Sequence, residues 1–244
     1  GFGEIKPYQL NPNTVDFTIR PASKTYDGTR TVKYGNSSAL SDVKSNYITG
    51  ATVTIGSTQA PVLDDLKLIS ATYDTKDVDG GRSTDRVTYT LAYTGTSGNF
   101  SLGGNATIAP KGDGIITKKD VTATVKSPVT KVYDATKTVV GVAKNSANTV
   151  VANANDLIGM TGFTGNDGAT YTTTARYADK NVGTGKRVDY TLTLNGAAAG
   201  NYNLKYNGAN NSGAFSTNGN TITKRTVHVG FDPVSKDYDS TPIN

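Results

Sequence analysis

The sequence predicts an all-β fold made of tandem Ig-like antiparallel β-sandwich repeats, with small β-barrel or β-grasp-like repeats as the alternative. Three observations support this prediction. Apolar residues alternate with threonine along several segments, which is the pattern of a strand with one buried face. Asp outnumbers Glu by 19 to one, and Asp favours turns whereas Glu favours helices. Finally, a motif recurs about every 105 residues, which indicates domain-sized repeats.

The alternating segments define the expected strands. They include residues 15–19 and 51–55 in the first half of the chain, and residues 121–125 and 190–194 in the second. Turn clusters rich in Asp, Asn and Gly separate such segments. We therefore expect about six or seven strands in each repeat. Residues 147–157 form the one stretch in which we expect a short helix.

Two motifs establish the repetition. Lys-x-Tyr-Asp-x-Thr occurs three times and begins at Lys24, Lys131 and Lys236. Gly-Asn-aromatic-x-Leu occurs twice, and its central residues are Asn99, Phe100, Asn201 and Tyr202. Because the order and the spacing of both motifs recur, chance is a poor explanation.

The repeats define the expected domains. Residues 15–119 form the first repeat and residues 120–225 the second, each of a size that can hold its own core. Residues 226–244 begin a third repeat that is cut short, and residues 1–14 are the tail of a preceding repeat or a tag-linked leader. The chain is therefore expected to be a piece of a longer protein. Both junctions are short, which favours a spacer over freely swinging domains.

Composition excludes several function classes. The chain has no Cys, no Trp and one His, so disulfides, cysteine nucleophiles and two-histidine metal sites are absent from it. The net charge of +5 is spread along the sequence instead of being concentrated on one element, as nucleic-acid binding requires. We expect no enzymatic activity, no nucleic-acid partner, no membrane insertion by this segment and a monomeric state.

The first motif is interpreted as a structural turn. The Asp carboxylate accepts backbone N–H groups, and the Tyr buries its ring and donates its hydroxyl to a backbone carbonyl. The residues concerned are Lys24, Tyr26, Asp27, Lys131, Tyr133 and Asp134. Two alternatives remain open. One is a ligand or metal site at the end of each domain, and the other is an isopeptide bond from the motif lysine to a buried Asn.

The second motif is interpreted as a turn that leads into a strand, with Phe100 and Tyr202 as core anchors and Asn99 and Asn201 in the turn. A sugar-stacking role for the two aromatic residues is the alternative. Elsewhere, the loop of residues 74–80 is rich in carboxylates, and its candidate calcium ligands are Asp74, Asp77 and Asp79. The basic residues Lys76 and Arg82 compete for these carboxylates, so we expect a solvated loop and no cofactor.

Three segments together resemble the YDG repeat family: Tyr26-Asp27-Gly28-Thr29, residues 179–186, and residues 196–204. This family occurs in tandem in large bacterial surface adhesins, including filamentous-haemagglutinin-like proteins. The resemblance covers both repeats and the start of the third, and the second repeat matches best. It implies an extracellular location, at the bacterial surface or secreted, and it supplies no catalytic residues.

The sequence and the resemblance together predict a structural stalk or spacer segment of a bacterial cell-surface adhesin, whose partners are the neighbouring repeats of the same chain. The alternative is that the repeats themselves bind glycans or a host surface protein. The matches between the repeats fall on strands and tight turns, whereas residues 36–47 and 144–157 differ. This distribution favours the spacer, because a repeated binding site should preserve an exposed cluster.

Overall fold

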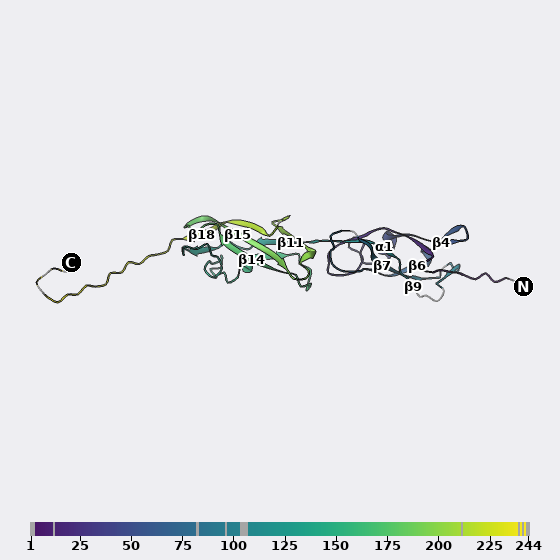
Figure 1. Cartoon of the computed structure of the whole chain (residues 1–244), viewed down its shortest axis with the longest axis horizontal. Coiled ribbons are helices and arrows are strands. Elements are labelled where there is room, and N and C mark those ends of the chain that lie inside the picture. Colours follow the sequence, from purple (N-terminus) through teal and green to yellow (C-terminus); the bar gives the residue numbers. More distant parts are fainter. Residues whose placement is uncertain are drawn as a thin grey trace. The chain divides into compact units, whose positions relative to one another are not determined.

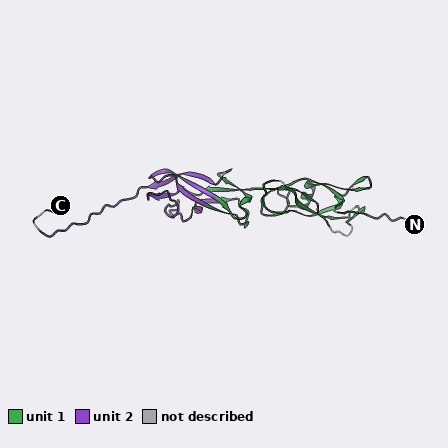
Figure 2. Ribbon diagram, viewed as in Figure 1, with its two compact units in different colours: residues 1–124, 160–172, 193–212 green, residues 125–159, 173–192, 213–244 purple. Residues whose placement is uncertain are grey.

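The structure is a computed structural model, and it describes residues 3–11, 13–81, 83–95, 97–102, 107–210, 212–238, 240 and 242. Among the described residues that lie in helices or strands, most lie in strands (Figure 1). The chain forms two compact units (Figure 2). Unit 1 contains Gly1–Thr124, Met160–Thr172 and Thr193–Ser212, and unit 2 contains Val125–Gly159, Thr173–Leu192 and Gly213–Asn244. Unit 1 therefore combines the first repeat with two segments of the second.

The largest sheet belongs to unit 1. Its path is β3 (Ala22–Thr25), β10 (Lys111–Thr117), β7 (Ser83–Tyr93) and β6 (Leu66–Tyr73), and β9 (Thr107–Ile108) also pairs with β7. Strand β10 runs parallel to β3 and antiparallel to β7. This arrangement places the strand that holds Lys24 beside the strand that closes the first repeat.

Two smaller sheets and a helix accompany the large sheet, and one of the two sheets pairs residues 8–9 with the first repeat. One sheet is antiparallel and contains β2 (Val15–Ile19), β4 (Ile48–Ile55) and β5 (Thr58–Pro61), and the other pairs β1 (Tyr8–Gln9) with β8 (Phe100–Ser101). Helix α1 (Leu40–Tyr47) precedes β4, and the 3-10 turn η1 (Leu63–Asp65) precedes β6. The helix buries Val43 and Tyr47.

One of the two sheets of the second repeat lies largely in unit 1. Its order is β13 (Ile158–Thr161), β11 (Lys119–Val125), β16 (Tyr202–Tyr206) and β17 (Ala209–Asn210). Strands β11 and β16 run parallel, with Lys119 opposite Tyr202. The 3-10 turn η3 (Ala199–Asn201) leads directly into β16.

Unit 2 is built on one four-stranded sheet. Its order is β12 (Thr130–Val132), β18 (Ala214–Thr223), β15 (Gly183–Asn195) and β14 (Thr170–Tyr177). The 3-10 turn η2 (Ala154–Leu157) begins with a capping box between Asn153 and Asp156. Strands β12 and β18 run parallel, as β3 and β10 do in unit 1.

The prediction of a mostly β chain is confirmed, and the four alternating segments all lie in strands. The prediction of purely antiparallel sheets is wrong, because four strand pairs are parallel. Alternation reports which face is buried and not which direction the neighbour runs. The described residues hold nine strands in the first repeat and eight in the second, more than expected, because two-residue strands add to the count.

The helix prediction is half right. Residues 147–157 hold η2, but the one α-helix of the described residues, α1, was not expected. Its sequence is rich in Ser, Asn and Asp, which are poor helix formers. Burial of Val43 and Tyr47 at a four-residue spacing offsets this low propensity.

One continuous hydrophobic core fills unit 1. It contains residues of the first repeat, such as Tyr26 and Tyr73, together with Val121, Ala198 and Tyr202 of the second. After β18, the described residues have no regular structure, and Phe231 is 90% exposed. Over the part of the chain that the structure describes, no helix is both long enough and apolar enough to cross a membrane.

The Lys-Tyr-Asp turns as candidate functional sites

The first motif buries a lysine at the end of a strand. Period-two alternation along β3 places Ala22 and Lys24 on the buried face. Lys24 Nζ donates to Asp27 Oδ1 at 2.7 Å and to the Thr29 carbonyl at 2.6 Å. It also reaches Thr29 Oγ1 at 3.2 Å and the Thr31 carbonyl at 3.2 Å. A buried ammonium is tolerated only with such acceptors around it.

The second copy has the same geometry. Lys131 lies on the buried face of β12, and its side chain is 1% exposed. Its Nζ donates to Asp134 Oδ1 at 2.7 Å, to the Thr136 carbonyl at 2.7 Å and to Thr136 Oγ1 at 3.1 Å. In both copies the carboxylate also accepts the backbone N–H two residues on, from Thr29 at 3.0 Å and from Thr136 at 2.9 Å.

The two carboxylates are held in the ionised state. Burial raises the pKa of Asp27, but hydrogen bonds from Lys24, Lys33 and Thr29 outweigh it, and the pKa falls well below its usual value. The hydrogen bond from Lys131 lowers the pKa of Asp134 to about 2. Burial lowers the pKa of Lys24, and the contact with Asp27 opposes that shift. Both carboxylates are therefore ionised at neutral pH.

A second tyrosine lies beneath each lysine. Lys24 Nζ is 5.4 Å from the Tyr73 ring centroid, and Lys131 Nζ is 5.5 Å from that of Tyr177, a favourable cation–π geometry. The Tyr177 hydroxyl donates to the Val129 carbonyl at 3.0 Å. Burial raises the pKa of both tyrosines. The Tyr73 hydroxyl donates to the Ile115 carbonyl at 3.4 Å, so Tyr73 and Tyr177 make the carbonyl contact that was expected of the motif tyrosines.

Tyr26 has a different partner from the one expected. Its hydroxyl donates to Asp167 Oδ2 at 3.2 Å and not to a backbone carbonyl, and its ring meets Tyr202 edge to face at 5.5 Å. The Tyr202 hydroxyl donates to the same carboxylate oxygen and accepts the Thr164 N–H at 2.9 Å. Phe163 packs edge to face on Tyr202 at 5.1 Å. Tyr26 is consequently only 1% exposed.

The second motif has diverged between its copies. Asn201 is buried, accepts the Val78 N–H at 2.8 Å and donates from Nδ2 to Asp77 Oδ1 at 2.8 Å. Its counterpart Asn99 is exposed, and its carbonyl accepts the Tyr8 N–H at 2.9 Å. The aromatic residues that follow, Phe100 and Tyr202, both lie in the hydrophobic core. Buried in this way, neither ring offers a face for sugar stacking.

The carboxylates of the loop 74–80 are matched by cations. Buried Arg86 forms ion pairs with Asp74, at 3.4 Å, and with Asp79. Lys76 pairs with Asp77 at 2.9 Å, and the hydrogen bond from Lys76 lowers the pKa of that carboxyl. Among the described residues no group of three metal-binding side chains converges. Arg82, the other expected competitor, lies outside the described residues.

The isopeptide alternative finds no support in this geometry. Such a bond requires an Asn amide beside the lysine nitrogen and a protonated acid. The hydrogen-bond partners of Lys24 and Lys131 are Asp and Thr residues and backbone carbonyls, and both acids are ionised. The lysines are already used in closing their own turns.

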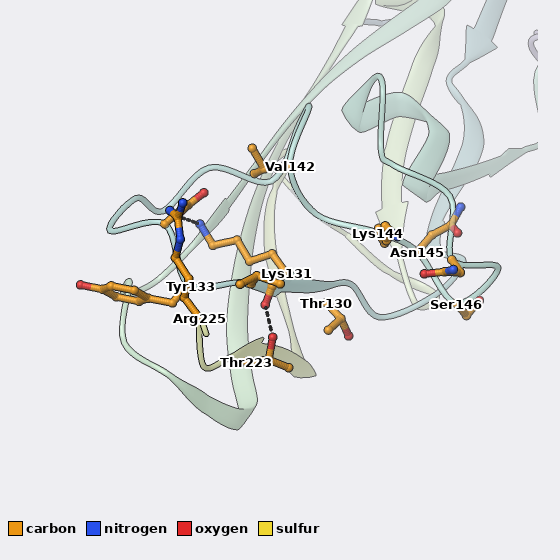
Figure 3. Close-up of a pocket in the computed structure, with 12 residues that line it drawn as sticks. Thr130, Lys131, Tyr133, Val142, Lys144, Asn145, Ser146, Thr223 and Arg225 are labelled. Atoms are coloured by element: carbon orange, nitrogen blue, oxygen red, sulfur yellow. Dashed lines mark hydrogen bonds and ion pairs between the residues drawn. The ribbon is translucent and has the colours of Figure 1, made fainter. Parts of the chain in front are cut away.

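The two copies of the turn differ in the size of the hollow beside the motif tyrosine. A hollow of about 850 Å³ lies beside Tyr133 in unit 2, and its lining includes Lys144, Asn145 and Arg225. Figure 3 shows the Tyr133 ring extending away from its strand. The neighbouring Val132 is 55% exposed. The equivalent hollow beside Tyr26 in unit 1 measures about 280 Å³.

Sequence reasoning missed Asp167, Phe163 and Thr164. They lie in a loop without a counterpart of similar sequence in the first repeat, so the repeat comparison could not select them. The signal that remained was Tyr26 itself, since a buried tyrosine hydroxyl needs a partner.

Comparison with known proteins adds one assignment to this geometry. Searches of curated proteins and of solved structures returned no match. Residues 117–210, which begin in the last residues of the first repeat and cover most of the second, match the family model described as the YDG domain.

Proposed function

We propose that this chain is a structural spacer segment in the stalk of a bacterial cell-surface adhesin, built from tandem β-sandwich repeats that project a binding region from the cell. The YDG domain in the second repeat supports the proposal, as does its partial recurrence in the first. The extracellular location is part of the same proposal.

One observation carries the proposal most directly. The most regular feature shared by the repeats is a cluster in which a buried Lys donates to a half-buried Asp and to a Thr of the same turn. Lys24 and Lys131 are both buried. A binding site repeated for avidity would instead preserve exposed polar groups. The shared residues therefore fix the shape of the domain end, which suits a spacer.

The experiment is a binding measurement on the whole chain, applied to a glycan array and to fixed epithelial cells at physiological salt. Salt matters because a chain of charge +5 adheres weakly to acidic surfaces. A protein of similar charge and size is the control. The spacer predicts no saturable binding above that control, and saturable, salt-resistant binding would overturn it.

The second candidate is that the repeats themselves bind glycans or a host protein. The hollow beside Tyr133 favours it, because its lining combines an aromatic residue with residues that carry amide and ammonium groups. Tyr133→Ala is the matching test, with the exposed Tyr34 changed to Ala as its control. Loss of binding in the first variant alone would favour this candidate over the spacer.

A further inference from the structure

The two motif tyrosines occupy equivalent positions but have different surroundings. Tyr26 is 1% exposed, whereas Tyr133 is only partly buried beside a hollow of about 850 Å³. The contacts of the lysine with the Asp and the Thr of the turn are the same in both copies, so these contacts do not cause the difference. The difference lies in the residues that cover Tyr26.

The residues that bury Tyr26 supply a carboxylate, an aromatic ring and a short loop. The Asp167 carboxylate accepts a hydrogen bond from the Tyr26 hydroxyl, and the Tyr202 ring packs edge to face with the Tyr26 ring. A short loop fits against the turn: a Cβ built on Gly28 would lie 3.1 Å from the Thr164 methyl. Lys119 adds a hydrogen bond to Thr164 Oγ1 at 3.0 Å. All these residues belong to unit 1.

The Tyr133 end offers the matching half of each contact. Tyr133 corresponds to Tyr26, Ala135 to Gly28 and Arg225 to Lys119 in the aligned motifs. Ala135 also repeats the left-handed backbone of Gly28, with φ of 63° against 75°. Arg225 and Tyr133 both line the hollow. A surface of this composition is complementary to a carboxylate flanked by aromatic residues.

The polypeptide that leaves this end identifies the occupant. In unit 1, β11 begins two residues after β10 and pairs with β16, with Lys119 opposite Tyr202. After β18, residues 226–229 repeat the alternation of β11, yet Val227 and Val229 are 80% and 75% exposed. They have the pattern of a first strand without the sheet that would bury it.

We propose that the Tyr133 end of the second repeat, residues 130–136, 144–148 and 223–225, is a docking surface for a third YDG domain in the same chain, which begins within residues 226–244. That domain would bind through its counterparts of Asp167, Thr164 and Tyr202. The inference deepens the proposed spacer role, because it names the joint by which one repeat fixes the next.

The test uses the absence of cysteine in this chain. In an extended chain, a second copy of residues 120–225 replaces residues 226–244. Ala135→Cys in the second repeat is combined with Thr164→Cys in the added copy, and the disulfide is mapped by mass spectrometry after mild oxidation. The reference is Gly28→Cys with Thr164→Cys in the original chain, where the same contact exists.

Cross-linking of both pairs is the expected result. A cross-link in the reference pair without one in the extended chain would overturn the inference. The absence of both would overturn it as well, because the template contact would then be missing. The single Ala135→Cys variant of the extended chain controls for links between molecules.

A second measurement needs no cysteine. Tyrosine nitration followed by peptide mapping should modify Tyr133 several-fold faster than Tyr26 in the original chain. In the extended chain Tyr133 should become as unreactive as Tyr26, and unchanged reactivity would refute docking. A glycan that binds the extended chain through Tyr133 would refute it too. By contrast, saturable binding of cells with Tyr133 protected would overturn only the spacer role.

Discussion

Asp134→Asn isolates the energetic role of the buried lysine cluster. The change keeps the shape of the side chain and an oxygen for the Thr136 N–H, but it removes the charge that faces Lys131. The Lys131 side chain is 1% exposed and the Asp134 side chain 26%. Removing one partner of a fully buried pair costs about 3–5 kcal/mol, and a charged hydrogen bond contributes about 1.5–3 kcal/mol. Because solvent reaches Asp134, we expect a loss of about 2 kcal/mol.

The assay is urea denaturation followed by far-UV circular dichroism at pH 7, with hydrogen exchange to locate the change in β12. Lys131→Met is the matched control, because it removes the cation and keeps the volume of the stem. In that background, Asp134→Asn should cost less than about 0.5 kcal/mol, since the charge no longer has a buried partner. Additive costs, or a negligible cost of Asp134→Asn alone, would refute the role of the pair.

The pH dependence follows from the same pair. The pKa of Asp134 is about 2 in the folded chain, against an ordinary value of 3.8. A carboxyl whose pKa is lowered by folding stabilises the folded state above its ordinary pKa, and this contribution disappears as the pH falls through the folded pKa. The stability difference between the original chain and Asp134→Asn should therefore be constant above about pH 5 and shrink between pH 4 and 2. A constant difference across this range would contradict the assignment.

Three further predictions follow from the turns and the loop 74–80. Gly28→Ala should destabilise unit 1 by about 1–2 kcal/mol, because φ is 75° there and the Thr164 methyl lies close. The matched change Ala135→Gly should be neutral or stabilising, and the reverse order of the two effects in thermal unfolding would be contrary evidence. Asn201→Ala should lower the free energy of unfolding by about 2–3 kcal/mol, because it leaves the Val78 N–H of the loop 74–80 without a partner. Asn99→Ala should lower it by less than about 0.5 kcal/mol. Equal losses in the two variants would contradict this prediction. Calcium and EDTA should both leave the melting temperature unchanged, because Lys76 and Arg86 already pair with carboxylates of the loop 74–80. A rise of the melting temperature with calcium would instead show a metal site.

The strands could be predicted because their signal is local. Alternation in residues 121–125 reports a buried face whatever the neighbour is. The parallel pairing of β10 with β3 was not predictable in this way, since it joins Ile116 to Lys24 across most of a repeat. Helix α1 was missed for a related reason: its stability comes from packing and not from propensity.

In the candidate turns too, the local contacts could be predicted from the sequence and the long-range contact could not. The contacts of Asp27 with Thr29 and Lys24 lie within a few residues, and the motif spacing predicts a turn there. The contact of Tyr26 with Asp167 spans 141 residues, and only the packed structure could reveal it. Repetition still helped, because it identified Tyr133 as the position to compare.

The buried lysine and the motif tyrosine act together if the turn sets the direction of the tyrosine ring. In both copies the strand ends one residue after the lysine, the tyrosine N–H donates to the closing strand, and the carboxylate accepts the N–H two residues on. Tyr26 N donates to the Thr117 carbonyl at 2.8 Å and Tyr133 N to that of Thr223 at 2.9 Å. A buried ion pair often adds little net stability and serves instead to specify a conformation. If that is its use here, Asp134→Asn should lower the yield of the cross-link at Ala135 in the extended chain even below the unfolding transition. A full yield with reduced stability would separate the two roles and leave the pair as a purely local support.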